Sequence, residues 1–241
     1  MPKAGVLTTI AFDADDTLWE NEQFFRLTQQ RFQALLADYV EGNHLSERLL
    51  AAERRNLGHY GFGVKGFVLS MIETAIEVTD AHVPASVIAE IMEAGREMLA
   101  HPITLLPHAD QTIRALAQDF DIFLITKGDL LDQERKLAQS GLGEMFDAVE
   151  IVSDKTPATY EQAFAHAGSD PTRAMMVGNS IRSDVVPALE AGAWGVHVPH
   201  GLTWEYERAE PPITQARFRA IEDLGDLPDL VGEISGQAGA L

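Results

Sequence analysis

The sequence contains no cysteine among its 241 residues. This absence excludes disulfide bonds, thiol nucleophiles and cysteine-ligated metal sites. Positive charge is also scarce, because 18 lysines and arginines stand against 37 aspartates and glutamates, which gives a net charge of −19. A chain this negative is a poor partner for nucleic acids or for an anionic membrane surface, so neither is expected as a ligand.

Long apolar runs are missing as well. No apolar segment approaches the ~20 residues that span a bilayer, and the N-terminus lacks the basic region and apolar run of a signal peptide. These absences predict a cytoplasmic protein. Apolar residues still make up 46% of the chain, which is enough for a sizeable core in one large domain or in a domain that carries a smaller one.

Short apolar runs predict buried β-strands. The runs cover residues 6–12, 121–125, 148–152, 174–177 and 195–198. Helical patterns that end before a glycine lie between the later runs, at residues 130–140, 159–167 and 184–191. Strands that alternate with helices in this way predict an α/β, Rossmann-like fold, with a parallel sheet covered by helices on both faces.

One segment, from residue 20 to 101, interrupts this alternation with apolar residues at helical spacing. These positions include Phe32, Leu35, Leu36, Tyr39 and Val40. The glycines of "GHYGFGVKGF" predict a loop at residues 58–67. We therefore expect 20–101 to form a helical domain, inserted into an α/β core domain made of residues 1–19 and 102–241. The end of the chain from about residue 230 is expected to be frayed.

Polar side chains follow four of the expected strands. They are Asp13 and Asp15 in "FDADDT", Thr126 in "LITKGD", Lys155 in "VSDKTP", and Asn179 and Asp184 in "GNSIRSD". Ligands of open parallel sheets bind beside the carboxyl ends of the strands, so we expect these side chains to converge. A divalent cation such as Mg²⁺ would relieve the repulsion among Asp13, Asp15 and Asp184. Thr126 and Lys155 offer donors to an anion, so the set predicts metal-assisted phosphoryl transfer.

Each of these side chains, taken alone, also fits a structural role. Asp15 or Asp16 with Thr17 is able to cap a following helix, and Asp184 is able to serve as a helix N-cap. A threonine such as Thr126 at a strand end is often purely structural. A lysine such as Lys155 is often a solvated surface residue. We favour the catalytic interpretation because the four motifs occur together, in this order and each at the end of a strand.

The four motifs resemble those of the haloacid dehalogenase-like hydrolases. "DADDT" is similar to the first motif of that family, Thr126 matches the second, Lys155 the third and "GNSIRSD" the fourth. The resemblance covers nearly the whole chain, and it implies a cap domain at residues 20–101. Asn179 departs from the pattern, because the family most often has aspartate at that position.

The resemblance also implies roles for single residues. Asp13 would be the nucleophile that forms an aspartyl-phosphate, and Asp15 would be the general acid and then the general base. Thr126 would hold a phosphoryl oxygen with help from nearby backbone N–H groups, and Lys155 would bridge the phosphoryl group and the nucleophile.

Further substrate contacts are expected from Lys127 and Gly128, which follow Thr126, and from Lys65 in the cap loop. The resemblance places Mg²⁺ among Asp13, the backbone carbonyl of Asp15, and the fourth motif. Whether Asn179 or Asp184 bonds directly to the metal stays open.

The expected function is Mg²⁺-dependent hydrolysis of a small phosphorylated metabolite. Alternatives within the family are a dehalogenase, which needs no acid such as Asp15, a phosphomutase, and a phosphonate hydrolase that would use an amine such as that of Lys65. A non-catalytic phospho-acceptor signalling domain is the alternative from another class, although its acidic residues usually follow a different strand. The sequence specifies neither the substrate nor the oligomeric state.

Overall fold

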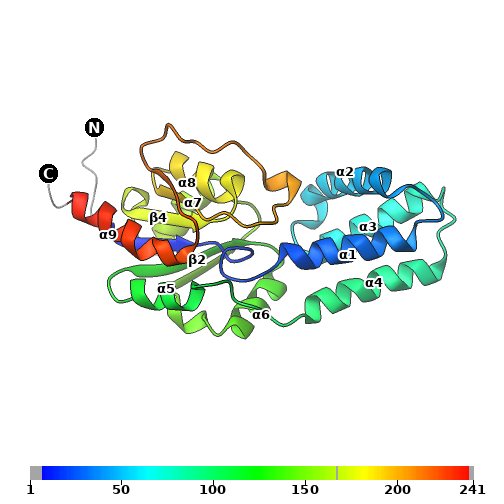
Figure 1. The fold of residues 1–241 in the computed structure, drawn as a ribbon, viewed down its shortest axis with the longest axis horizontal. Helices are drawn as coiled ribbons and strands as arrows, with labels where there is room; N and C mark the ends of the chain where they lie inside the picture. Colours follow the sequence, from blue (N-terminus) through cyan, green and yellow to red (C-terminus); the bar gives the residue numbers. More distant parts are fainter. Residues whose placement is uncertain (1–6, 167, 239–241) are drawn as a thin grey trace. The chain divides into compact units, whose positions relative to one another are not determined.

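The computed structural model describes residues 7–166 and 168–238, which form two compact units (Figure 1). Within the described residues, the first unit contains residues 7–20, 103–127, 133–166 and 168–238, and the second contains residues 21–102 and 128–132. The division into a core domain and an inserted domain stays a prediction.

A parallel sheet, six-stranded in the described part of the chain, forms the centre of the first unit. Its strands are β1 (Thr9–Phe12), β2 (Asp121–Lys127), β3 (Ala148–Val152), β4 (Ala174–Gly178), β5 (Trp194–His197) and β6 (Phe218–Ala220). They lie in the order β3-β2-β1-β4-β5-β6. Strands β2 and β3 are added on one side of β1, and β4 to β6 are added on the other, so the strand order reverses between β1 and β4. Ligands of such sheets bind where the strand order reverses. The predicted α/β fold with a parallel sheet is confirmed.

Helices cover both faces of this sheet (Figure 1). They are α5 (Ala109–Leu116), α6 (Leu130–Ser140), α7 (Pro157–His166), α8 (Val186–Glu190) and α9 (Leu227–Ala238). Successive strand residues point to opposite faces. In β1, Ile10 and Phe12 pack in a cluster with residues of α5 and α9, whereas Ala11 packs with residues of α7 and α8.

Two features of this unit differ from the sequence-based expectation. Strand β6 was not expected, since three residues are too few to show a pattern. The expectation of a frayed end from residue 230 is wrong for the described residues, because α9 continues to Ala238 and buries Val231 and Ile234 in the core. Residue 6, the first residue of an expected strand, and residue 167, the last of an expected helix, lie outside the described residues.

The second unit is a set of helices around its own apolar core. They are α1 (Glu22–Leu35), α2 (Gly42–Tyr60), α3 (Val64–Val78) and α4 (Ala85–Ala100). The expected loop at residues 58–67 is shorter than predicted, because only Gly61 to Gly63 separate α2 from α3. Gly61 and Gly63 have φ values of 71° and 108°, which glycine adopts most easily. Nowhere in 7–166 or 168–238 does a helix combine the length and apolar character needed to cross a membrane.

Helices α3 and α4 approach closely at Gly95. A Cβ atom built on Gly95 would lie 2.4 Å from Cγ2 of Val68. Valine is stiff at χ1, so its methyl group has little freedom to move away. The close packing of this helix pair therefore depends on a glycine at position 95.

Gly95→Ala should lower the free energy of unfolding by about 1–3 kcal/mol through overpacking. Gly58→Ala is the matched control, because Gly58 is exposed on α2 and its added Cβ would meet nothing within 4 Å. That control should stabilise the protein by up to about 1 kcal/mol through helix propensity. Chemical denaturation measures both. A cost of Gly95→Ala that persists in a Val68→Ala background would contradict the proposed clash.

Candidate active site

Asp13, Lys155 and Asp184 form a buried cluster of charges at the carboxyl edge of the sheet. Asp13 directly follows β1, Lys155 follows β3 and Asp184 follows β4. The Lys155 ammonium donates to Oδ1 of Asp13 at 2.5 Å and to Oδ1 of Asp184 at 2.7 Å. The side chains of Lys155 and Asp184 are each 1% exposed, and that of Asp13 is 10% exposed. Two carboxylates therefore share one ammonium away from water.

Burial and neighbouring charge change the proton affinity of this cluster. Burial raises the pKa of the Asp13 carboxyl to about 7, and the Asp184 charge adds to this effect although Lys155 opposes it. Burial acts to lower the pKa of Lys155, but Asp13 and Asp184 outweigh it and the pKa rises. Lys155 is thus held in its charged form, while the second carboxylate lacks a partner charge. The cluster is suited to an additional cation.

Gly178, at the end of β4, makes room for Asp184. A Cβ atom on Gly178 would lie 2.3 Å from Oδ2 of Asp184. The same Oδ2 accepts a hydrogen bond from the backbone N–H of Ser180 at 2.8 Å. Asp184 lies inside the π-helical turn Ile181–Val185, whose N-cap is Ser180. Its interpretation as a simple N-cap is therefore wrong.

The alternative that Asp15 or Asp16 caps the next helix is also wrong. That helix, α1, begins at Glu22, and its N-cap is Asn21. Residue Thr17 instead turns back toward the fourth motif. Its hydroxyl oxygen accepts a hydrogen bond from the backbone N–H of Asn179 at 3.0 Å. The same hydroxyl lies 3.4 Å from two acceptors, Oδ1 of Asn179 and Oδ2 of Asp13. Thr17 thereby brings the amide of Asn179 beside the Asp13 carboxyl.

Asp15 faces a different set of partners from Asp13. Its Oδ1 accepts from the indole N–H of Trp19 at 2.7 Å, and both oxygens lie 2.9 Å from the Lys136 ammonium. The side-chain amide of Gln133 donates to Oδ2 at 3.3 Å and to the buried hydroxyl of Thr126 at 2.7 Å. Gln133 and Lys136 were not anticipated, although residues three apart on α6 share a face of the helix.

Lys127 and Gly128 follow Thr126, and β2 extends through Lys127. The Lys127 ammonium contacts Oε1 of Glu207 at 2.5 Å and the Ser183 hydroxyl at 2.7 Å. Burial acts to raise the pKa of Glu207, but Lys127 and the hydrogen bonds from Ser180 and Ser183 together outweigh it, so the pKa is lowered. Glu207 comes from the short turn Glu205–Glu207 after β5, and no sequence signal pointed to it. Gly128 has a φ of 152°, and it belongs to the second unit.

Lys65 lies in the second unit, where its ammonium pairs with Asp129. It is 2.9 Å from each Asp129 oxygen, and its side chain is 54% exposed. Its expected role as a substrate contact stays a prediction. Any such contact would have to compete with Asp129 for the ammonium.

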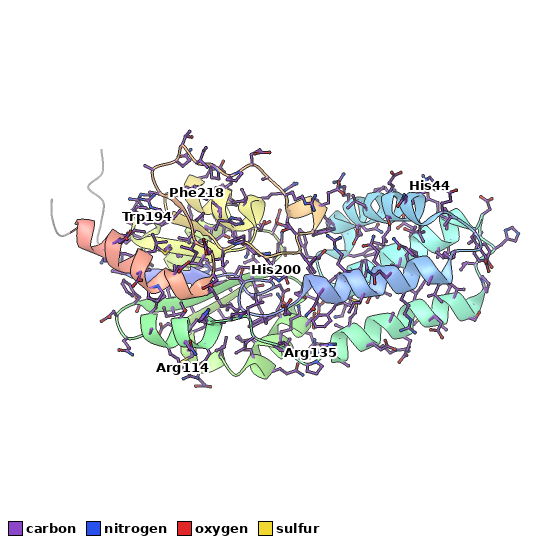
Figure 2. The ribbon with its side chains drawn as sticks, in the orientation of Figure 1. His44, Arg114, Arg135, Trp194, His200 and Phe218 are labelled. Carbon is purple, nitrogen blue, oxygen red and sulfur yellow. The ribbon has the colours of Figure 1, made fainter. Side chains whose placement is uncertain are left out.

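A further group of metal-ligand side chains, which the sequence did not suggest, lies beside the first motif. Asp16, Glu20 and His200 each offer a ligand atom, and these atoms lie within 4.8 Å of one another. The imidazole of His200, labelled in Figure 2, lies between the carboxylates, with Nδ1 3.6 Å from Asp16 and Nε2 3.5 Å from Glu20. The two ring nitrogens of His200 thus face different carboxylates, which is also the arrangement of an ion pair with a protonated imidazole.

Known proteins are similar to this chain over most of its length. The model of the haloacid dehalogenase-like hydrolase family matches residues 7–192. A haloacid dehalogenase-like family hydrolase from Xanthomonas campestris, whose structure is solved, is 40% identical and superposes with a TM-score of 0.87. That match covers 98% of this chain and 94% of the other.

Two curated relatives are more distant. A glyceraldehyde 3-phosphate phosphatase of Methanothermobacter thermautotrophicus is 23% identical over 239 residues, with 94% of this chain and 100% of that protein covered. A pyrimidine 5'-nucleotidase of Escherichia coli is 29% identical over 109 residues, which cover 43% of this chain and 48% of that protein. By name, both relatives act on phosphorylated small molecules.

In the metal-free protein, Asp13→Asn should raise the melting temperature at pH 8, and the gain should shrink below pH 6. An unfolded aspartate has a pKa of about 3.9, whereas folded Asp13 has a pKa of about 7. The stability that protonated Asp13 contributes is therefore fully present below the unfolded value and is lost as the pH rises through 7. Asparagine has no charge to bury.

The melting temperatures of wild type and Asp13→Asn, measured between pH 5 and pH 8 in buffer that contains a metal chelator, test this prediction. Asp119→Asn is the control, because Asp119 is exposed beside α5 and should show no pH-dependent difference from wild type. A melting difference for Asp13→Asn that is the same at pH 5 and pH 8 would contradict the raised pKa.

Proposed function

Because this chain belongs to the haloacid dehalogenase-like hydrolases, we propose that it hydrolyses phosphate monoesters of small metabolites with Mg²⁺, through a phosphorylated Asp13. The observation that carries the proposal is the buried cluster in which Asp13 and Asp184 share the Lys155 ammonium. A carboxylate that is buried, oriented and in need of positive charge is suited to attack phosphorus beside a cation.

The donors around Asp13 fit Mg²⁺. Carboxylate, amide and carbonyl oxygens are the hard ligands that this ion prefers, and Asp13, Asp184, Asn179 and the backbone of Asp15 would supply them. The raised pKa of Asp13 supports this assignment, because it reflects a local shortage of positive charge. When bound, Mg²⁺ would neutralise charge shared by the carboxylates and the phosphoryl group.

In the first proposed step, an Asp13 oxygen bonds to phosphorus while the bond from phosphorus to the leaving oxygen breaks. Asp15 gives its proton to that leaving oxygen, so the alcohol departs neutral. Lys155 would stay beside both Asp13 and the transferred phosphoryl oxygens. The Thr126 hydroxyl and the backbone N–H groups of Lys127 and Gly128 would bind the remaining oxygens.

In the second proposed step, water attacks the phosphorus of the aspartyl-phosphate. Asp15, now ionised, takes the proton of that water, and the bond between phosphorus and the Asp13 oxygen breaks. Phosphate leaves and both carboxyl groups return to their starting states. The same Asp15 group thus serves as acid and then as base.

Two considerations favour a phosphate ester over the carbon–halogen bond as the bond cleaved. A halide leaves without protonation, so a dehalogenase has no need of a second carboxyl such as Asp15. The curated relatives, by their names, act on glyceraldehyde 3-phosphate and on a pyrimidine nucleotide. The proposed substrate is accordingly a small phosphorylated metabolite, with a sugar or nucleoside as its leaving group.

We also propose that the helices at residues 20–101 serve as a cap domain that excludes bulk water during turnover. Such exclusion would protect an aspartyl-phosphate from unselective reaction and strengthen the electrostatics of the site. Lys65, whose ammonium pairs with Asp129, is kept in this proposal as a substrate contact from the cap.

Purified protein should hydrolyse 4-nitrophenyl phosphate with Mg²⁺, and Asp13→Asn should abolish the turnover because no phosphoenzyme can form. Asp184→Asn should raise the Mg²⁺ concentration for half-maximal rate on the order of ten- to a hundredfold. Asn179→Asp adds a carboxylate and should lower it. Metal titrations of the initial rate measure these shifts.

Asp119→Asn, an exposed change of the same type, should leave the metal titration unaltered. Full activity after exhaustive chelation would argue against the metal, and turnover of a 2-haloacid without phosphatase activity would favour the dehalogenase. If only Asp184→Asn shifts the titration, Asn179 is not a ligand.

A further inference from the structure

The environment of the Asp15 carboxylate contains three side chains with no role in the mechanism above. Trp19, Gln133 and Lys136 make four donor contacts to its two oxygens. Trp19 is fully buried, while Gln133 and Lys136 are 3% and 8% exposed. Carboxylates that are surrounded by buried donors are held in one orientation.

The two oxygens of Asp15 are held unequally. Oδ1 receives the indole N–H of Trp19 at 2.7 Å, and the rigid indole is anchored in the core of the sheet unit. Oδ2 receives Gln133 only at 3.3 Å. The Lys136 ammonium is 2.9 Å from both oxygens, so it fixes the plane of the carboxylate rather than one end of it.

Gln133 has more acceptors than it has hydrogens to donate. Its side-chain NH₂ carries two hydrogens, yet it faces Thr126 Oγ1 at 2.7 Å, the Lys127 carbonyl at 3.3 Å and Asp15 Oδ2 at 3.3 Å. Turning the amide around would place its oxygen against the Lys127 carbonyl, which only accepts hydrogen bonds. Asp15 Oδ2 is therefore the oxygen most readily released to exchange a proton.

We propose that Trp19 and Lys136 are positioning residues for Asp15: Trp19 holds Oδ1, Lys136 fixes the plane of the carboxylate, and Oδ2 transfers the proton. This inference rests on the proposed phosphatase function. As Oδ2 gives its proton to the leaving oxygen, negative charge develops on Asp15, and the adjacent Lys136 ammonium stabilises it. In the second step the same ammonium keeps the carboxylate directed at the incoming water.

The signature of this role is a dependence on the leaving group. Esters of alcohols with a high pKa need the proton most, whereas 2,4-dinitrophenol departs without it. Lys136→Met should therefore slow the release of an alkyl alcohol about tenfold more than the release of 2,4-dinitrophenol. This loss is a fraction of the ~10²–10⁴-fold rate increase that general acid catalysis typically supplies. Trp19→Phe, which removes one donor and keeps an aromatic core residue, should show the same pattern more weakly.

The rates to compare are kcat/KM for one alkyl and one dinitrophenyl ester, in Lys136→Met, Asp15→Asn and the double variant. If Lys136 acts through Asp15, the two changes should be non-additive, and Lys136→Met should add no further discrimination to Asp15→Asn. Arg114→Met is the charge-matched control, because Arg114 is exposed on α5, where Figure 2 labels it. It should leave both esters unaffected.

A spectroscopic measurement needs neither substrate nor metal. The chain has three tryptophans, so Trp19→Phe identifies the indole N–H signal of Trp19 in a proton–nitrogen correlation spectrum. That signal should shift in Asp15→Asn and in Lys136→Met, and should stay in place in Arg114→Met. The same spectra show whether each variant is folded.

The outcomes separate the two proposals. Wild-type protein that hydrolyses no phosphate ester would overturn the proposed function. Wild-type activity with an equal loss on both esters in Lys136→Met, or additive effects with Asp15→Asn, would overturn the positioning role alone. An unmoved Trp19 signal in Lys136→Met would also overturn it, because the shared contact would then be absent in solution.

Discussion

The single ammonium of Lys155, buried between Asp13 and Asp184, is the interaction on which the rest of the site depends. It requires that the ends of β1, β3 and β4 meet at one edge of the sheet, which the strand order provides. It also requires Gly178, since any side chain there would occupy the place of Asp184. A buried pair of this kind is costly unless its charges are compensated, so its retention points to function rather than to stability.

The two aspartates of the first motif differ because their surroundings differ. Asp13 shares one cation with a second carboxylate, whereas Asp15 has the Lys136 ammonium and two neutral donors around it. The negative charge of Asp13 is only partly compensated, which suits a nucleophile, whereas that of Asp15 is compensated, which suits a group that acts as acid and then as base. The separation arises within a few residues of chain, because the turn after β1 directs one carboxylate toward β3 and β4 and the other toward α6.

Much of this arrangement could be predicted from the sequence. Buried strands show as short apolar runs, and the polar residue after each run lies at a known edge of a parallel sheet, which is why Asp13 and Lys155 were found. Other residues carried no such local signal. Glu207 reaches Lys127 from an irregular segment, and Lys136 lies in a helix where a lysine is ordinarily solvated. Helix α9 was missed because its glycines and acids outweighed its buried positions.

The central claim is that Asp13 carries the phosphoryl group during turnover, and trapping that species tests it most directly. Protein mixed with excess phosphate ester and Mg²⁺ can be quenched in acid within a turnover, digested and analysed by mass spectrometry. One phosphate is expected on the peptide that contains Asp13. With a 2,4-dinitrophenyl ester, whose leaving group needs no proton, the amount should be larger in Asp15→Asn, because formation is spared while the attack of water is slowed. Phosphate on another residue, or hydrolysis that persists in Asp13→Asn with no labelled peptide, would contradict it.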